Sequence, residues 1–76
     1  MEQPERFRIF VLQDQRLVMV LCNLCEKEWD DSGRFWEAGR YINLPDLYQT
    51  ATEAKAKADS FAQVMEHKRA EDCKHC

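Results

Sequence analysis

The sequence has little glycine and proline, with two of each among its 76 residues. The glycines, Gly33 and Gly39, cannot form a loop that cradles a phosphate group. The two serines, Ser32 and Ser60, do not stand in the sequence context of a catalytic nucleophile. These absences argue against nucleotide-dependent and serine-based chemistry, and we expect no enzyme activity.

Basic charge is not in excess, because 14 acidic and 11 basic residues give a net charge of −3. A nucleic-acid-binding domain normally carries a basic excess, so the composition disfavours nucleic acid as a partner. The longest apolar run, residues 17–22, is far too short to span a bilayer. Residues 1–5 are acidic and polar, unlike the start of a secretory signal peptide. We therefore expect a cytoplasmic protein without membrane contact.

The length predicts a single domain over residues 1–76, with residues 1–5 frayed. With 45% hydrophobic and 33% charged residues, the composition is that of a folded protein. A domain this small buries a limited core and commonly relies on a disulfide, a metal or a partner. We therefore expect a disulfide, a metal or a partner to stabilise the fold in addition to its core.

All four cysteines lie in two Cys-x-x-Cys sequences, Cys22–Cys25 and Cys73–Cys76. In the cytosol, disulfides are rare, and this spacing turns two thiolates toward one ion. Four thiolates fill a tetrahedral coordination sphere, which indicates a structural rather than a catalytic metal. We predict Zn²⁺ bound by Cys22, Cys25, Cys73 and Cys76. An iron–sulfur cluster accepts the same ligands and ranks below zinc.

Two histidines, His67 and His75, are reserve ligands that could replace a cysteine. Both are more simply interpreted as solvated side chains. A redox-active Cys-x-x-Cys usually stands at a helix N-terminus, which lowers the thiol pKa. Cys22 ends a predicted strand and Cys73 lies near a predicted helix C-terminus, so the pattern disfavours a disulfide reductase.

The N-terminal half predicts a small antiparallel sheet. Residues 6–12 and 17–22 are rich in β-branched and aromatic residues and are separated by a short polar break, which predicts a hairpin. Residues 34–38 and 40–42 predict a third strand, interrupted by a bulge at Gly39.

From Leu44 onward, apolar residues recur every three or four positions, which predicts one long α-helix to about residue 71. Asn43 is the preferred N-cap, with Pro45 in the first turn. A rival start is Thr50, with Glu53 completing a capping box. The predicted fold class is therefore α+β: a hairpin plus a third strand, packed on one C-terminal helix and held by a metal.

This predicted path also brings the two cysteine pairs together. The third strand carries the chain away from Cys22 by about 30 Å, and about 40 Å of helix returns it to Cys73. The four cysteines and the strand-then-helix order resemble zinc-ribbon and treble-clef domains. They also resemble small zinc-binding proteins of bacteria and phages, in which an Ala-rich helix follows a strand-borne Cys-x-x-Cys. The resemblance implies a structural zinc.

One face of the predicted hairpin has no covering layer in this scheme. The single helix must cover the face of Cys22, because it has to reach that cysteine. A monomer rarely exposes a large contiguous apolar surface, so we predict an interface with a second copy or a target protein. Its residues are Phe10, Leu12, Leu17, Met19 and Leu21. The alternative is that the N-terminal residues or residues 26–34 fold over this face, which would make it internal core.

The sequence thus favours a small zinc-stabilised binding or regulatory protein that acts through protein–protein contacts. The alternative is a nucleic-acid-binding zinc module. Its motivation is a local basic face, formed by arginines on or beside the predicted strands: Arg6, Arg8, Arg16, Arg34 and Arg40.

Overall fold

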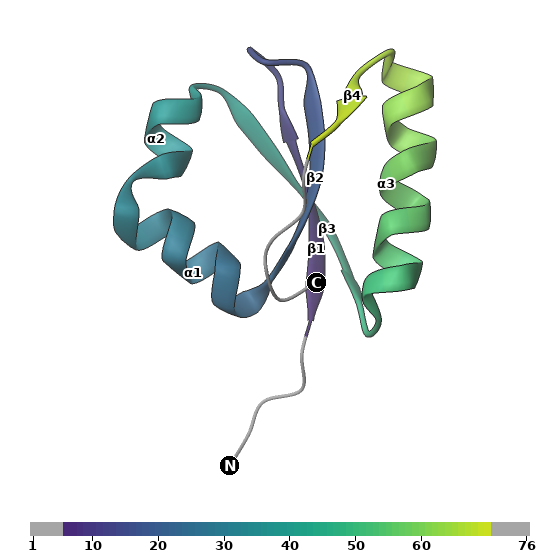
Figure 1. Ribbon diagram of the computed structural model, residues 1–76, viewed down its shortest axis with the longest axis horizontal. Coiled ribbons are helices and arrows are strands. Elements are labelled where there is room, and N and C mark those ends of the chain that lie inside the picture. The colour runs from purple at the N-terminus through teal and green to yellow at the C-terminus, as the bar shows by residue number, and fades with distance from the viewer. Residues whose placement is uncertain (1–5, 71–76) are drawn as a thin grey trace.

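The computed structural model describes residues 6–70, in which helices lie on both faces of a four-stranded sheet (Figure 1). In chain order the elements are β1 (Phe7–Leu12), β2 (Leu17–Cys22), α1 (Asn23–Ser32), α2 (Arg34–Ala38), β3 (Tyr41–Tyr48), α3 (Ala51–Met65) and β4 (Lys68–Arg69). The predicted α+β class is confirmed.

The predicted hairpin is confirmed with its register. β1 and β2 pair antiparallel, with Leu12 opposite Leu17 and Phe10 opposite Met19. Both strands are almost wholly buried, because each lies in the middle of the sheet, whose order is β3-β1-β2-β4. Strands covered on both faces tolerate apolar side chains at every position, as these two have.

β3 forms an edge of the sheet and pairs antiparallel with β1. The register shifts between Arg8 and Phe10, which lie opposite Leu47 and Asn43. Pro45 falls inside this irregular stretch. An edge strand tolerates proline because its outer N–H groups have no strand to pair with. Pro45 also hinders another chain from adding to this edge.

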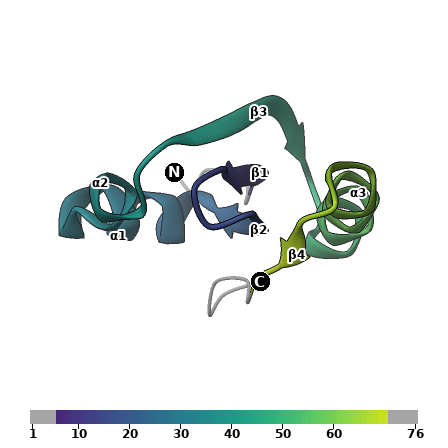
Figure 2. The ribbon, with the colours of Figure 1, turned by 90° about the horizontal axis from the view of Figure 1, so that it is seen from above.

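One face of the sheet is covered by α3 (Figure 2). The helix turns the small side chains Ala54, Ala58 and Ala62 inward, and all three are buried. Their size lets the helix axis approach β2 closely. The expected apolar helix face is therefore confirmed, although Phe61 is only half-buried at its border.

The opposite face is covered by α1 and α2, so the prediction of an uncovered face is wrong (Figure 2). The ring of Phe10 stacks on that of Phe35 in α2, with centroids 5.1 Å apart. Burial of the predicted interface set follows from this second layer: Phe10, Leu12, Met19 and Leu21 are buried and Leu17 is half-buried. The face is internal core.

The prediction of a strand at residues 34–38 is also wrong, because these residues form α2. Phe35 and Ala38, three positions apart, are its buried residues, a spacing that suits a helix and not a strand. Gly33, at φ 77°, ends α1, and Gly39, at φ 83°, ends α2. The glycine expected to form a bulge is thus a helix terminator.

The preferred helix start was placed too early. Residues 41–48 form β3, and α3 begins at Ala51 after the rival N-cap, Thr50. The Thr50 hydroxyl accepts the backbone N–H of Glu53 at 3.2 Å, as a capping residue does. The helix ends at Met65, rather than near residue 71.

The path of the chain between the two ends of the sheet therefore differs from the predicted one. α1 and α2 carry the chain from Cys22 to the hairpin end, and β3 returns it to the Cys22 end (Figure 1). α3 then leads away again, and β4 lies beside the start of β2. None of the helices within residues 6–70 has the length and apolar character needed to cross a membrane.

Candidate metal centre

Cys22 and Cys25 lie where β2 passes directly into α1. Cys22 is the last residue of the strand and the N-cap of the helix, with extended backbone angles. The backbone N–H of Asn23 donates to the Arg6 carbonyl at 3.1 Å, which fixes this junction against the residue preceding β1. Both cysteines are buried, with 2% and 3% of their surface exposed.

The two cysteines share one helical turn. The backbone N–H of Cys25 points at the Sγ of Cys22, at 3.5 Å. A neutral thiol is a weak acceptor, and it is not among the usual N-cap side chains. A thiolate accepts more strongly, and its charge is favoured at the N-terminus of a helix. The junction therefore aims a backbone N–H at the sulfur of Cys22, an arrangement that also suits a metal-bound sulfur.

Cys22 and Cys25 stand at a helix N-terminus, contrary to the expectation from the sequence. Cys22 ends a strand, as expected, but the same residue begins a helix. The argument that the pair is not at a helix N-terminus is therefore wrong for Cys22 and Cys25. The first Cys-x-x-Cys fits half of a tetrahedral thiolate site, and it equally fits a redox pair.

The other predicted ligands, Cys73, Cys76 and His75, lie outside the described residues. Within residues 6–70, no three His, Cys, Asp or Glu side chains come together in a way that could hold a metal ion. The structure therefore describes two of the four predicted ligands, and it places these two together.

His67 lies at the opposite end of β2 from the cysteines. Its neighbour Lys68 pairs with Leu17, the first residue of the strand, whereas Cys22 is the last. Five strand residues span about 16 Å, too far for a shared metal. His67 therefore lies too far from Cys22 and Cys25 to act as a reserve ligand at their site.

β4 gives the direction of the chain after α3. It pairs with β2 in parallel, Lys68 opposite Leu17 and Arg69 opposite Val18. The backbone N–H groups of Lys68 and Ala70 donate to the carbonyls of Arg16 and Val18, both at 2.9 Å. At Ala70 the chain therefore runs alongside β2 in the direction of Cys22.

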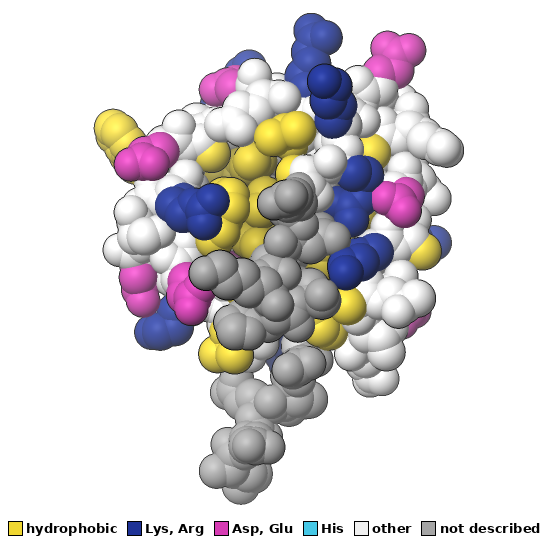
Figure 3. Space-filling model, in the orientation of Figure 1, with side chains coloured by type: hydrophobic (Ala, Val, Ile, Leu, Met, Phe, Trp, Pro, Cys, Tyr) yellow, Lys and Arg dark blue, Asp and Glu magenta, His cyan; other side chains and the backbone are white. Residues whose placement is uncertain are grey.

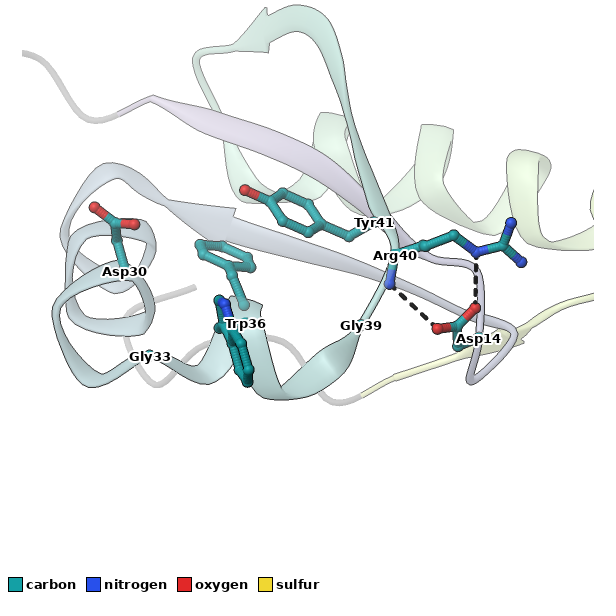
Figure 4. Close-up of a pocket in the computed structure, with 8 residues that line it drawn as sticks. Asp14, Asp30, Gly33, Trp36, Gly39, Arg40 and Tyr41 are labelled. Atoms are coloured by element: carbon teal, nitrogen blue, oxygen red, sulfur yellow. Dashed lines mark hydrogen bonds and ion pairs between the residues drawn. The ribbon is translucent and has the colours of Figure 1, made fainter.

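A second feature, which the sequence analysis did not identify, is an open hollow of about 690 Å³ between α1, α2 and β3 (Figure 4). Phe35 and Tyr41 stack in its wall with centroids 4.7 Å apart. Trp36 also lines it and is 88% exposed. The available signal was Trp36 beside Phe35 between two glycines, which was interpreted as a strand.

Three of the five arginines expected to form a basic face contact other side chains of the chain. Arg8 pairs with Glu26 at 3.5 Å and Arg40 with Asp14 at 3.1 Å. The guanidinium of Arg34 lies over the ring of Trp29, 4.1 Å from its centroid. On the face in Figure 3, basic side chains are interspersed with acidic ones.

Comparison of the chain with protein-family models, with curated proteins and with solved structures finds no match.

Proposed function

We propose that the protein is a small binding module whose fold is stabilised by one structural zinc ion, held by Cys22, Cys25, Cys73 and Cys76. The observation that carries the proposal is the parallel register of β4 on β2. In the sequence, Cys73 follows Arg69 by four residues, as Cys22 follows Val18, so an extended continuation of β4 along β2 would bring Cys73 level with Cys22. Cys25 lies in the first turn of α1 after Cys22, and Cys76 follows Cys73 at the same sequence spacing.

The distances involved are consistent with such a site. From Val18 to Cys22 the strand advances four residues, or about 13 Å. Between Arg69, which pairs with Val18, and Cys73 there are also four peptide units, which span at most about 14 Å. Since Ala70 already lies beside β2, this length suffices to reach the junction of β2 and α1.

A metal at this place would stabilise the weakest part of the sheet. β4 has only two residues, and two-residue strands contribute few backbone hydrogen bonds. The Arg69 guanidinium adds contacts to Asp59 at 2.6 Å and to the Val18 carbonyl at 2.9 Å. Zinc would bind the end of the chain to the β2–α1 junction, and its binding free energy would contribute to folding.

A binding role is supported by the surface of the second layer. Trp36, on α2, is 88% exposed, although large aromatic side chains are usually covered unless they bind a partner. The dispersed, internally paired arginines favour a protein partner over nucleic acid.

Native mass spectrometry of the purified protein tests the metal site. We expect one zinc per monomer, and loss of the metal in Cys22→Ser and in Cys73→Ser. Serine is a good N-cap, so Cys22→Ser removes the ligand and keeps the start of α1. If Cys73→Ser retains stoichiometric zinc with unchanged melting, the four-cysteine site is wrong.

A second candidate function, thiol–disulfide exchange, is favoured by the position of Cys22 at the N-cap of α1. A helix N-terminus is the usual position of a reactive Cys-x-x-Cys. Metal-free protein that forms a Cys22–Cys25 disulfide and reduces a disulfide substrate would support it. Stoichiometric zinc that protects both thiols from alkylation would argue for the structural site.

A further inference from the structure

The hollow between α1, α2 and β3 has a fixed aromatic wall. Phe35 stacks on buried Phe10 and on Tyr41, with centroid distances of 5.1 and 4.7 Å, and the Phe10 and Tyr41 centroids are 6.3 Å apart. Trp29 contacts the same ring at 5.2 Å. This stack joins the sheet to both short helices, so the wall is preorganised rather than formed on binding.

Trp36 is held beside this wall and turned outward. Its neighbours in α2, Phe35 and Ala38, are buried, which fixes the rotation of the helix. Among the described residues, no ring contact involves the Trp36 indole. Figure 4 shows its ring projecting away from Tyr41 at the rim of the hollow. A rigid, exposed indole is a common anchor for a partner.

The charge at the hollow comes from Asp30. This exposed carboxylate borders the hollow and also a smaller one beside it, lined in part by Tyr41 and Asn43. The other charges nearby are compensated: Asp14 pairs with Arg40, Glu26 with Arg8, and Lys27 with Asp31 at 3.9 Å. Within residues 6–70, Asp30 has no ion-pair partner.

An exposed carboxylate beside aromatic faces is complementary to a guanidinium. Arginine pairs with carboxylates and stacks on tryptophan or tyrosine rings. This surface already contains one such contact, since Arg34 lies 4.1 Å from the centroid of Trp29. The net charge of −3 also attracts a basic partner.

From this complementarity we infer that the hollow binds an arginine side chain presented by a partner protein. The guanidinium pairs with the Asp30 carboxylate, and its flat face stacks on Trp36 or Tyr41. Arginine, rather than an apolar residue, is the occupant because the uncompensated charge at the hollow is negative. This inference specifies the surface and the partner chemistry of the binding function proposed above, and it does not depend on the zinc.

The test is a ¹⁵N NMR titration of the whole protein with a short capped alanine peptide carrying one central arginine. We expect a saturable shift of the Trp36 indole N–H signal. The same peptide with citrulline, a neutral isostere of arginine, should bind at least about tenfold more weakly, as should Asp30→Asn with the arginine peptide. Asp31→Asn is the matched control and should bind like wild type, because Asp31 is adjacent in α1 but does not line the hollow.

The inference would be overturned by equal affinity for the arginine and citrulline peptides, or by equal weakening of peptide binding in Asp30→Asn and Asp31→Asn. Two further results would overturn it. The third is a shift of the Trp36 signal without peptide that grows with protein concentration, and the fourth is a shift of this signal caused by single-stranded DNA. The third would identify a second copy as the occupant, and the fourth a nucleic acid. Trp36→Ala, at an exposed site, keeps the test valid if an α1 variant does not fold: followed by backbone amide signals instead of the indole, it should bind the arginine peptide more weakly than wild type. A protein that purifies without zinc and still binds arginine would contradict the metal site alone, whereas a zinc-loaded protein that does not bind arginine would contradict this inference alone.

Discussion

The carboxylate of Asp14 accepts two hydrogen bonds from Arg40, one from its backbone N–H at 3.2 Å and one from its guanidinium Nε at 3.1 Å (Figure 4). This pair joins the β1–β2 turn to the residue before β3. It also lies at one end of the hollow. The edge strand is thereby anchored where it leaves α2.

Asp14 makes stability depend on pH. The Arg40 backbone N–H, followed by its guanidinium, holds the pKa of this carboxyl below its ordinary value of 3.8. A lowered folded-state pKa contributes stability that is present above the unfolded value and is lost as pH falls through the folded value. Melting curves from neutral pH to below pH 4 should show a wild-type advantage over Asp14→Asn that shrinks on acidification. A gap that is constant with pH would contradict this.

Gly39 should be far less replaceable than Gly33. Gly39 has φ 83° and ψ −141°, a region that other residues almost never adopt, and a Cβ there would collide with the Asp14 carboxylate. Gly33 is in the ordinary left-handed region with open space around it. In urea denaturation we expect Gly39→Ala to cost roughly 3 kcal/mol or more and Gly33→Ala about 1 kcal/mol. Equal costs would show that the α2–β3 junction is not constrained as described.

The layer formed by α1 and α2 makes Phe10 a core residue. Its side chain is 1% exposed, so Phe10→Ala should lower the free energy of unfolding by about 3–5 kcal/mol. Trp36→Ala removes an aromatic ring of similar size from the surface and should change stability by less than about 0.5 kcal/mol. Chemical denaturation that ranks the two in the opposite order would restore the uncovered-face prediction.

The close approach of α3 to the sheet depends on small side chains. Ala58 is fully buried and Ala56 is exposed on the same helix. We expect Ala58→Leu to cost about 1–3 kcal/mol through overpacking. Ala56→Leu should be near neutral, because leucine is a good helix former. Similar melting temperatures for the two variants would mean that the helix face is assigned wrongly.

The hairpin and the alanine-rich helix could be predicted from the sequence because their signals are local. Strand composition and a short polar break fix β1 and β2, and the Thr50–Glu53 capping box marks the true start of α3. The early start at Asn43 failed because apolar residues in β3, such as Leu44 and Leu47, continue the spacing of the helix by coincidence.

The second layer could not be predicted because it depends on tertiary packing. Residues 34–38 include aromatic residues, which are favoured in strands. In the structure, however, Phe35 stacks on Phe10, and the segment that carries Phe35 is helical. Because α1 was not predicted either, one sheet face was left uncovered, and this produced the interface prediction. Of the candidate site, the pairing of Cys22 with Cys25 required only their spacing, whereas the helix cap and the direction of β4 required the structure.

Zinc K-edge X-ray absorption on the monomer is the most direct test of the central claim, that both cysteine pairs bind one ion. For the proposed four-cysteine site we expect one zinc per chain, with four sulfur neighbours at about 2.3 Å and no nitrogen. A coordination shell that contains nitrogen or oxygen, or a purified protein without zinc, would contradict it.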